Sequence, residues 1–380
     1  MKKIIIHIGS EKCGSTSLQN FFFENELALV QHGFSYFCDP EKSYFYVSRD
    51  GHQKGHFPVV ASLCAQKPDY LIEDKVASYA KVLGDLIADA RISDKHIILS
   101  AEHFSSRLRA LESLEILRDA LNDFDVKIVL YVRPQHEMLV SSYNAGVRAG
   151  RRSSFGFDEG IKFDPYFNYY ELVKPWADVF GRERIVIRDW LQLKYGDVRK
   201  DFVLSVLNLE STHGFVFGKN NNKSLNVPHL EAIRLMNHHL PMFDECKSGE
   251  EWDRTSAARR IVSDVEGLSG PALAEIMSDQ QLIDLWELFR ESNALLEDEY
   301  MTRGALAGWQ PLGRVRSANE DRPDRADMAI IAAQLAKLCA QFEYDVYIAR
   351  QELNSVYGSA SWRATAVLRH VNRALQRLFG

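Results

Sequence analysis

The feature that most restricts the fold is an alternation of short apolar runs with longer amphipathic stretches. The runs are rich in β-branched residues and bounded by polar or turn residues, a pattern typical of strands buried on both faces of a parallel sheet. Four such runs occur, at residues 4–8, 96–100, 127–132 and 184–188. Helical patterns lie at residues 17–30, 75–90, 105–121, 136–150, 169–180 and 198–207. This alternation predicts an α/β fold with a doubly wound parallel sheet flanked by helices, and ligands at the carboxyl ends of the strands.

The later part of the chain predicts a different organisation. From Pro228 onward no strand-like run occurs, so we expect a helical cap over residues 228–301, within a main domain of residues 1–307. Residues 308–325 hold Gly, Pro, Asn and clustered charges without an apolar period, which is typical of a linker. Residues 326–380 predict a helical C-terminal extension.

Two parts of this extension leave alternatives open. Apolar residues recur at three- and four-residue steps through residues 331–356, and this seam could dock on the protein's own domain or form a homodimer. The last helix has an apolar side and a basic side that carries Arg369, Arg373 and Arg377. It could dock on the core or contact an anionic membrane peripherally. Docking is the more ordinary outcome for both.

Composition and charge exclude several classes of protein. A formal net charge of −6, with 46% hydrophobic and 26% charged residues, describes a globular chain that binds no nucleic acid. The five cysteines form no C-x-x-C pair, which indicates neither a zinc site nor a disulfide framework. The first apolar run is too short for a signal peptide, and no later segment is long enough to span a membrane. We therefore expect a cytoplasmic protein, free or held peripherally at the inner face of the membrane, that requires no metal.

The first predicted strand leads directly into a glycine-containing loop and then into a helix. Backbone N–H groups and the helix dipole converge at such a helix N-terminus, which makes it an anion site suited to phosphate. The lysine of the loop lies two positions before its glycine, whereas a Walker A loop reads G-x-x-x-x-G-K-[ST], so the loop is of another type. The expected phosphate-binding residues are Lys12, Cys13, Gly14, Ser15, Thr16 and Ser17.

Two other predicted strands also end in candidate site residues. The third strand ends at Arg133, and Ser141 follows eight positions later on the next helix. The planar fork of an arginine can bind two phosphate oxygens at once. The second strand is followed by Glu102 and His103, either of which could accept a proton at that edge of the sheet.

These elements together resemble a known family. The pattern H-I-G-x-x-K-x-G-S-T-S-L-Q at residues 7–19, with R-P-x-x-x-x-x-x-S-x-Y from Arg133, is similar to sulfotransferases that use 3′-phosphoadenosine-5′-phosphosulfate (PAPS), in particular the bacterial carbohydrate-type members. The resemblance extends from residue 1 to roughly residue 241. It implies a P-loop-like fold, PAPS as the sulfuryl donor and a carbohydrate acceptor. Residues 357–365 resemble a tail motif of bacterial enzymes that build surface polysaccharides, which suggests such a polysaccharide or its precursor as acceptor.

The resemblance also implies roles for single residues. Lys12 would bind the donor and stabilise the leaving group, and Glu102 would act as the base, with His103 as the competing choice. The other residues expected at the donor are Arg133 and Ser141, on the 3′-phosphate, and Lys223 and Ser224, in a late loop that covers the nucleotide.

Three residues are expected near the acceptor, namely His56, His103 and Arg148. His56 lies between glycines, which predicts a loop rather than a metal-binding helix. Arg148 could bind an anionic acceptor or merely complement the negative end of its helix. Two other functions stay open. The displaced lysine argues against a P-loop kinase or other nucleotide-binding enzyme, and the complete set of site residues argues against a non-catalytic polysaccharide-assembly protein.

Overall fold

A computed structural model describes most of the first 311 residues of the chain. The described residues are 1–10, 12–47, 54–64, 79–218, 224–242, 245–247, 249–265, 268, 270–275 and 277–311. The predicted tail and nearly all of the predicted linker lie outside them, as does Lys223. The homodimer seam at residues 331–356 and the membrane contact of the last helix therefore stay predictions. No helix among the described residues is long and apolar enough to cross a membrane.

The centre of the molecule is a five-stranded sheet in which every pairing is parallel. Its strands, in spatial order, are β2 (Phe34–Ser35), β5 (His96–Ser100), β1 (Lys3–His7), β6 (Asp125–Val132) and β7 (Ile185–Asp189). The predicted α/β fold class is confirmed, and the four predicted strands are present within two residues of their expected bounds. The chain leaves β1 toward one edge of the sheet and later returns to build the other, so the carboxyl ends of β1 and its two neighbours form the point where ligands bind in such sheets.

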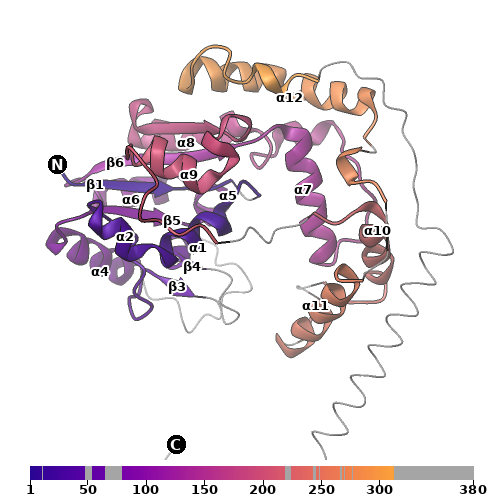
Figure 1. Cartoon of the computed structure of the whole chain (residues 1–380), viewed down its shortest axis with the longest axis horizontal. Helices are drawn as coiled ribbons and strands as arrows, with labels where there is room; N and C mark the ends of the chain where they lie inside the picture. The colour runs from indigo at the N-terminus through magenta and orange to yellow at the C-terminus, as the bar shows by residue number, and fades with distance from the viewer. Residues whose placement is uncertain are drawn as a thin grey trace, which may run out of the picture.

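Helices cover both faces of this sheet (Figure 1). On one face α4 (Tyr79–Ile92) contacts α6 (Leu111–Ala120), which contacts α8 (Tyr169–Phe180), whereas α1 (Ser15–Glu24) contacts α9 (Val198–Asp201) on the other. This division follows from right-handed crossovers that run in opposite directions along the sheet. The remaining elements of this part are α2 (Glu26–Gln31), the hairpin of β3 (Tyr46–Val47) and β4 (Lys54–Gly55), α3 (Phe57–Leu63) and α5 (His103–Arg107).

The structure breaks two helices that the sequence predicts as continuous. Between α1 and α2, the side chain of Asn25 donates to the carbonyls of Phe21 and Val216, each at 2.9 Å, and so ends the first helix. Between α5 and α6, Leu108 leaves the helical conformation and is buried in the core. The second break matters for the site, because it allows α5 to begin directly after Glu102 at the end of β5.

Helices follow the sheet in the region for which a cap is predicted, and they are called the cap helices below. They are α10 (Val227–Met236), α11 (Gly249–Ser263) and α12 (Asp279–Tyr300), with one antiparallel bridge between Asn226 and Ala272 that the sequence did not predict. The helix α7 (Gln135–Arg148) stands at the carboxyl edge of the sheet, with α10 and α11 beside it and α12 running above α8 (Figure 1). Separate apolar clusters join α7 to α10 and α11 and to α12. The helix α7 therefore connects the sheet to the cap.

Candidate active site at the carboxyl edge of the sheet

The loop between β1 and α1 presents an uncapped helix N-terminus. Gly14 is the N-cap of α1 in the left-handed conformation, with φ of 79°, and no side chain accepts a hydrogen bond from the first turn. That turn, which begins at Ser15, also holds no acidic residue. The N–H groups at the start of an α-helix have no partner within the helix, so they are available here to an anion.

Two glycines allow this loop to pack closely. A Cβ on Gly9 would lie 2.8 Å from the hydroxyl oxygen of Ser15 and 3.0 Å from the Cα of Glu102. A Cβ on Gly14 would lie 3.0 Å from Val198 and 3.1 Å from the ring of Trp190. Because both glycines also have positive φ, a larger residue would strain the backbone and displace its neighbours. The loop is thus packed against the ends of β5 and β7.

The side chains of the loop divide into exposed and buried groups. Lys12 is exposed and has a φ of 66°, a conformation that residues other than glycine adopt rarely and that is concentrated at functional sites. Cys13 is fully buried, and burial raises the pKa of its thiol to about 12, so the thiol stays protonated. The buried Ser15 hydroxyl donates to the carbonyl of Ser10 at 3.2 Å. Lys12 is therefore the mobile cation of the loop, and Thr16 and Ser17 are its half-buried hydroxyls.

Glu102 lies beside this loop, at the end of the neighbouring strand β5. Its carboxylate accepts a hydrogen bond from Gln19 of α1 at 3.1 Å. Burial raises the pKa of the Glu102 carboxyl above its usual value, while the hydrogen bond from Gln19 and the positive charge of Lys12 act in the opposite direction. A carboxylate whose pKa is raised by burial is a stronger proton acceptor than an exposed one. The charge of Lys12 thus acts on the carboxyl of Glu102.

The competing residue, His103, is the first residue of α5. Its ring packs edge-on against Phe57, with the ring centres 4.5 Å apart. His103 and Glu102 share the same edge of the sheet, so the choice of base between them stays a prediction.

Arg133 lies on the opposite side of the loop, at the end of β6. One guanidinium nitrogen donates to the carbonyl of Lys12 at 2.9 Å, and the group lies 5.4 Å from the ring of Trp190. Two other nitrogens donate to the carboxylate of Glu137, at 2.7 and 3.2 Å. Sequence reasoning missed Glu137, which lies in the first turn of α7, directly after the strand end that carries Arg133. A phosphate that binds Arg133 must therefore compete with Glu137.

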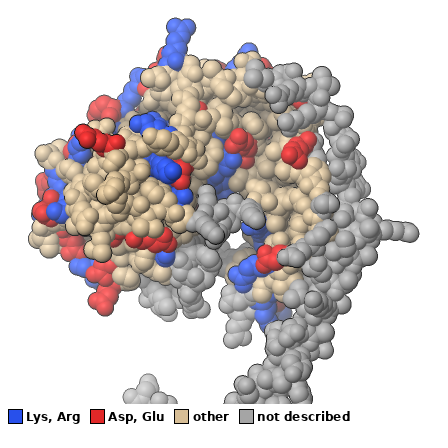
Figure 2. Space-filling view, viewed as in Figure 1, with Lys and Arg blue, Asp and Glu red and all other residues tan. Residues whose placement is uncertain are grey.

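A cavity of about 590 Å³ opens between Lys12 and α7. The space-filling view shows both basic and acidic side chains near the hollow between the sheet and the cap helices (Figure 2). Ser142, not Ser141, lines the cavity, and consecutive residues of a helix point about 100° apart. The structure therefore places the predicted Ser141 on the adjacent side of α7. The lining residues are Lys12, Ser106, Arg109, Ser142, Ala145, Gly146, Ala149, Asp164, Tyr166 and Phe167.

The prediction that His56 contacts an acceptor is corrected by the structure. His56 is fully buried, its Nδ1 accepts a hydrogen bond from the backbone N–H of Ser100 at 3.1 Å, and its ring packs against Tyr36 and Phe45. Burial lowers the pKa of His56 to about 3, so the ring is neutral. The residues next to His56 in sequence are rich in hydrogen-bond donors, which is typical of a binding loop. The aromatic residues that bury its ring come from an earlier segment, so the local sequence did not indicate burial.

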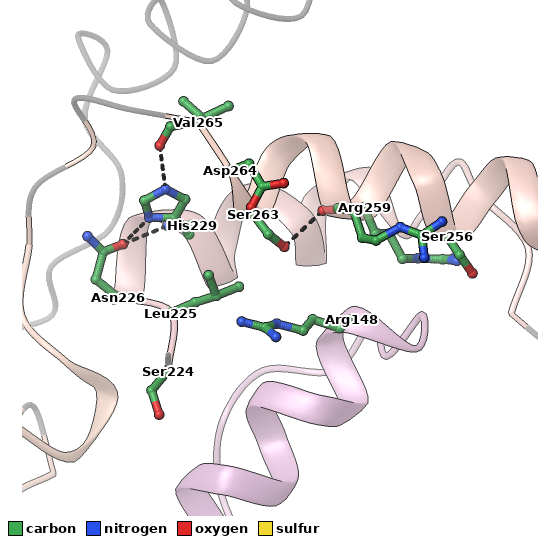
Figure 3. Close-up of a pocket in the computed structure, with 11 residues that line it drawn as sticks. Arg148, Ser224, Leu225, Asn226, His229, Ser256, Arg259, Ser263, Asp264 and Val265 are labelled. Atoms are coloured by element: carbon green, nitrogen blue, oxygen red, sulfur yellow. Dashed lines mark hydrogen bonds between the residues drawn. The ribbon is translucent and has the colours of Figure 1, made fainter. Parts of the chain in front are cut away.

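Arg148 and Ser224 lie elsewhere, in a second cavity between α7 and the cap (Figure 3). This cavity does not include Lys12 among its lining residues. The predicted partner of Ser224, Lys223, lies outside the described residues. The structure thus gathers Lys12, Gly14, Glu102 and Arg133 at one site and leaves Arg148 and Ser224 at another.

Comparisons with known proteins find similarity among solved structures. No protein-family model and no curated protein matches the chain. Among solved structures, the chain is similar to a crystal structure of a sulfotransferase from Alicyclobacillus acidocaldarius, with 16% sequence identity and a TM-score of 0.36 over 68% of this chain and 96% of that chain. We base the function on the residues of the site.

Proposed function

We propose that this protein is a PAPS-dependent sulfotransferase that acts on a hydroxyl or amine of a carbohydrate. The observation that carries the proposal is the meeting of three strand ends. β5, β1 and β6 are adjacent in the sheet, and their carboxyl ends carry Glu102, the Lys12 loop and Arg133. A base, an anion site and a second phosphate ligand therefore line one edge of the sheet.

The loop between β1 and α1 suits the 5′-phosphosulfate group of PAPS. Its uncapped helix N-terminus provides N–H donors, and Gly14 allows an anion to approach the backbone. Lys12 belongs to this loop, two positions before the glycine, and its charge acts on Glu102, the proposed base. Arg133, which donates to the carbonyl of Lys12, can bind a further phosphate beside this loop.

PAPS supplies the sulfuryl group, and the residues of the chain position the reactants and neutralise the charge that develops. Glu102 accepts the proton of the acceptor hydroxyl as the acceptor oxygen forms its bond to sulfur. Lys12 and the N–H groups of α1 donate to the phosphate oxygen whose bond to sulfur breaks, and so offset the charge that develops there. Most of the rate gain in this scheme comes from orientation and fixed charge.

The acceptor is proposed from the resemblance of the tail to that of enzymes that build bacterial surface polysaccharides. A polysaccharide or its precursor fits this reading, with the protein in the cytoplasm or peripherally at the inner face of the membrane. A screen of bacterial oligosaccharides with labelled PAPS tests it. Transfer confined to acceptors other than carbohydrates would contradict it.

The first prediction concerns nucleotide preference. We expect 3′-phosphoadenosine-5′-phosphate to bind much more tightly than AMP or ATP, because Arg133 binds the additional phosphate. Arg133→Ala should remove about 2 kcal/mol of this preference, roughly 30-fold in affinity, the worth of charge-assisted hydrogen bonds. Isothermal titration calorimetry with the three nucleotides measures it.

Arg290→Ala is the matched control, since Arg290 is exposed on α12 and pairs with Glu287 three positions away. It should bind all three nucleotides as the wild type does. Equal affinity for AMP and 3′-phosphoadenosine-5′-phosphate in the wild type would reject the donor assignment, and tightest binding of ATP would favour the kinase alternative.

The second prediction follows from the ion pair of Arg133 with Glu137. If this carboxylate competes with phosphate, Glu137→Gln should strengthen binding of 3′-phosphoadenosine-5′-phosphate about two- to fivefold, because a partly exposed pair contributes up to about 1 kcal/mol. Binding of AMP should change less. The same calorimetry checks it, with Glu287→Gln as control. A weaker affinity in Glu137→Gln would mean that Glu137 orients Arg133 instead.

A further inference from the structure

A second cavity, of about 610 Å³, lies where the end of α7 meets α10 and α11. Figure 3 shows Arg148 at the end of α7, below α11, which carries Ser256, Arg259, Ser263 and Asp264. The chemistry proposed above uses none of these residues.

Arg259 is the unusual residue of this cavity. Only 1% of it is exposed. Its Nε donates to Asn237 at 2.8 Å and its Nη2 to the carbonyl of Pro241 at 2.7 Å, but Nη1 has no hydrogen-bond partner in the part of the chain that the structure describes. Its recorded hydrogen bonds are thus to neutral oxygens. A buried cation without an anionic partner is costly, so the site favours an anion.

The other groups of the lining favour an anion as well. Arg148 and Arg260 are basic, and the Ser256 hydroxyl is buried without a hydrogen-bond partner among the described residues. Against the three arginines stands one carboxylate, Asp264, whose charge acts on Arg148. The described lining thus carries an excess of positive charge and at least two unused donors, on Arg259 and Ser256.

The position of the cavity relates it to the proposed active site. Both cavities are lined by residues of α7: Ser142 lines the first and Arg148 the second. Arg148 lies six residues after Ser142, on another side of the helix and about 9 Å further along its axis. This span is comparable to one or two sugar units. A group held at Arg259 could thus belong to a molecule that also reaches the carboxyl edge of the sheet.

We propose that this cavity binds an oxyanion group, a carboxylate or a sulfate, carried by the acceptor. The inference rests on the proposed function for its acceptor, but the anion site itself does not. The guanidinium of Arg259 binds the oxyanion from within the cavity, and Arg148 and Arg260 bind it from the rim. A phosphate of the donor nucleotide is the other source of the same chemistry, and the test separates the two.

The test titrates inorganic sulfate and glucuronate into the full-length Lys12→Ala variant, at constant ionic strength, and follows binding by calorimetry. Lys12→Ala weakens the anion site of the first loop, so the second cavity dominates. We expect saturable binding of both anions. Adding Arg148→Gln and Arg260→Gln should weaken both at least tenfold, whereas adding Arg290→Gln should not. Arg259→Gln serves as a further variant if it folds, and the rim variants decide the matter if it does not.

Crystals of the wild type soaked with selenate, an anomalous analogue of sulfate, locate the site. A selenium peak within hydrogen-bond distance of Arg259 is expected, and its absence under saturating selenate overturns the inference. The inference also fails if adding Arg148→Gln and Arg260→Gln leaves the affinity of Lys12→Ala for sulfate and glucuronate unchanged. If glucuronate displaces sulfate from this cavity and 3′-phosphoadenosine-5′-phosphate does not, the bound oxyanion belongs to the acceptor. Competition by the nucleotide overturns that part. If the nucleotide does not bind at all, the proposed function fails while the sulfate and glucuronate titrations still decide the site.

Discussion

Glu102→Gln should reduce sulfuryl transfer by about 10²- to 10⁴-fold, the usual contribution of a general base. Glutamine keeps the size of the side chain and can still hydrogen-bond to Gln19, but it does not accept a proton. The affinity for 3′-phosphoadenosine-5′-phosphate should persist, because the groups proposed to bind the nucleotide belong to the Lys12 loop and to Arg133. Turnover with labelled PAPS, together with calorimetry, separates the two effects.

The matched control is Glu112→Gln, on the first turn of α6, where the carboxylate is exposed. It should transfer at the wild-type rate. Wild-type turnover in Glu102→Gln would reject this carboxylate as the base, and His103→Ala would then be the variant to measure.

The pH profile gives a second view of the same residue. Because burial raises the pKa of Glu102, transfer should decline on acidification at a higher pH than an ordinary glutamate would give. The hydrogen bond from Gln19 lowers this pKa, so Gln19→Leu, of similar volume, should move the acidic limb to higher pH. If the acidic limb stays unchanged in Gln19→Leu, the group that titrates in this limb is not Glu102.

The sequence predicts the elements of the sheet well, because each strand is a local apolar run. It does not predict their order, which depends on long-range pairing. The adjacency of β5, β1 and β6 is what joins Glu102, Lys12 and Arg133, and only the structure provides it. The short strands β2, β3 and β4 have two residues each, too few for a periodic pattern.

Among the site residues, sequence reasoning found those that follow predicted strands and missed their partners. Gln19 and Arg259 lie on helices whose burial no local pattern indicates, and each is defined by a contact with a distant segment. Ser142 lines the cavity beside Lys12, whereas Ser141 points about 100° away around α7, so its contact with a 3′-phosphate stays a prediction. The prediction for His56 was wrong because this polar residue, although it lies in a glycine-containing stretch, is buried in the core.

Lys12→Ala should damage both donor binding and turnover, and the second more than the first. In the proposed mechanism the lysine contacts the donor in the ground state, so its loss should weaken binding of 3′-phosphoadenosine-5′-phosphate by about 1.5–3 kcal/mol, roughly 10- to 150-fold. Its charge is needed more strongly as the leaving oxygen becomes negative, so turnover at saturating PAPS should fall by a further 10²- to 10³-fold, as for other preorganised donors at a developing anion.

The same variant should also move the acidic limb of the pH profile. The charge of Lys12 lowers the pKa of Glu102, so its removal should raise that pKa and shift the limb to higher pH. Lys174→Ala, an exposed lysine on α8 paired with Asp178, is the control and should change neither quantity. A Lys12→Ala variant that loses affinity but turns over normally at saturating PAPS would show that the lysine binds the donor without stabilising the leaving group. A limb that stays in place would show that Lys12 and Glu102 do not act on each other during catalysis.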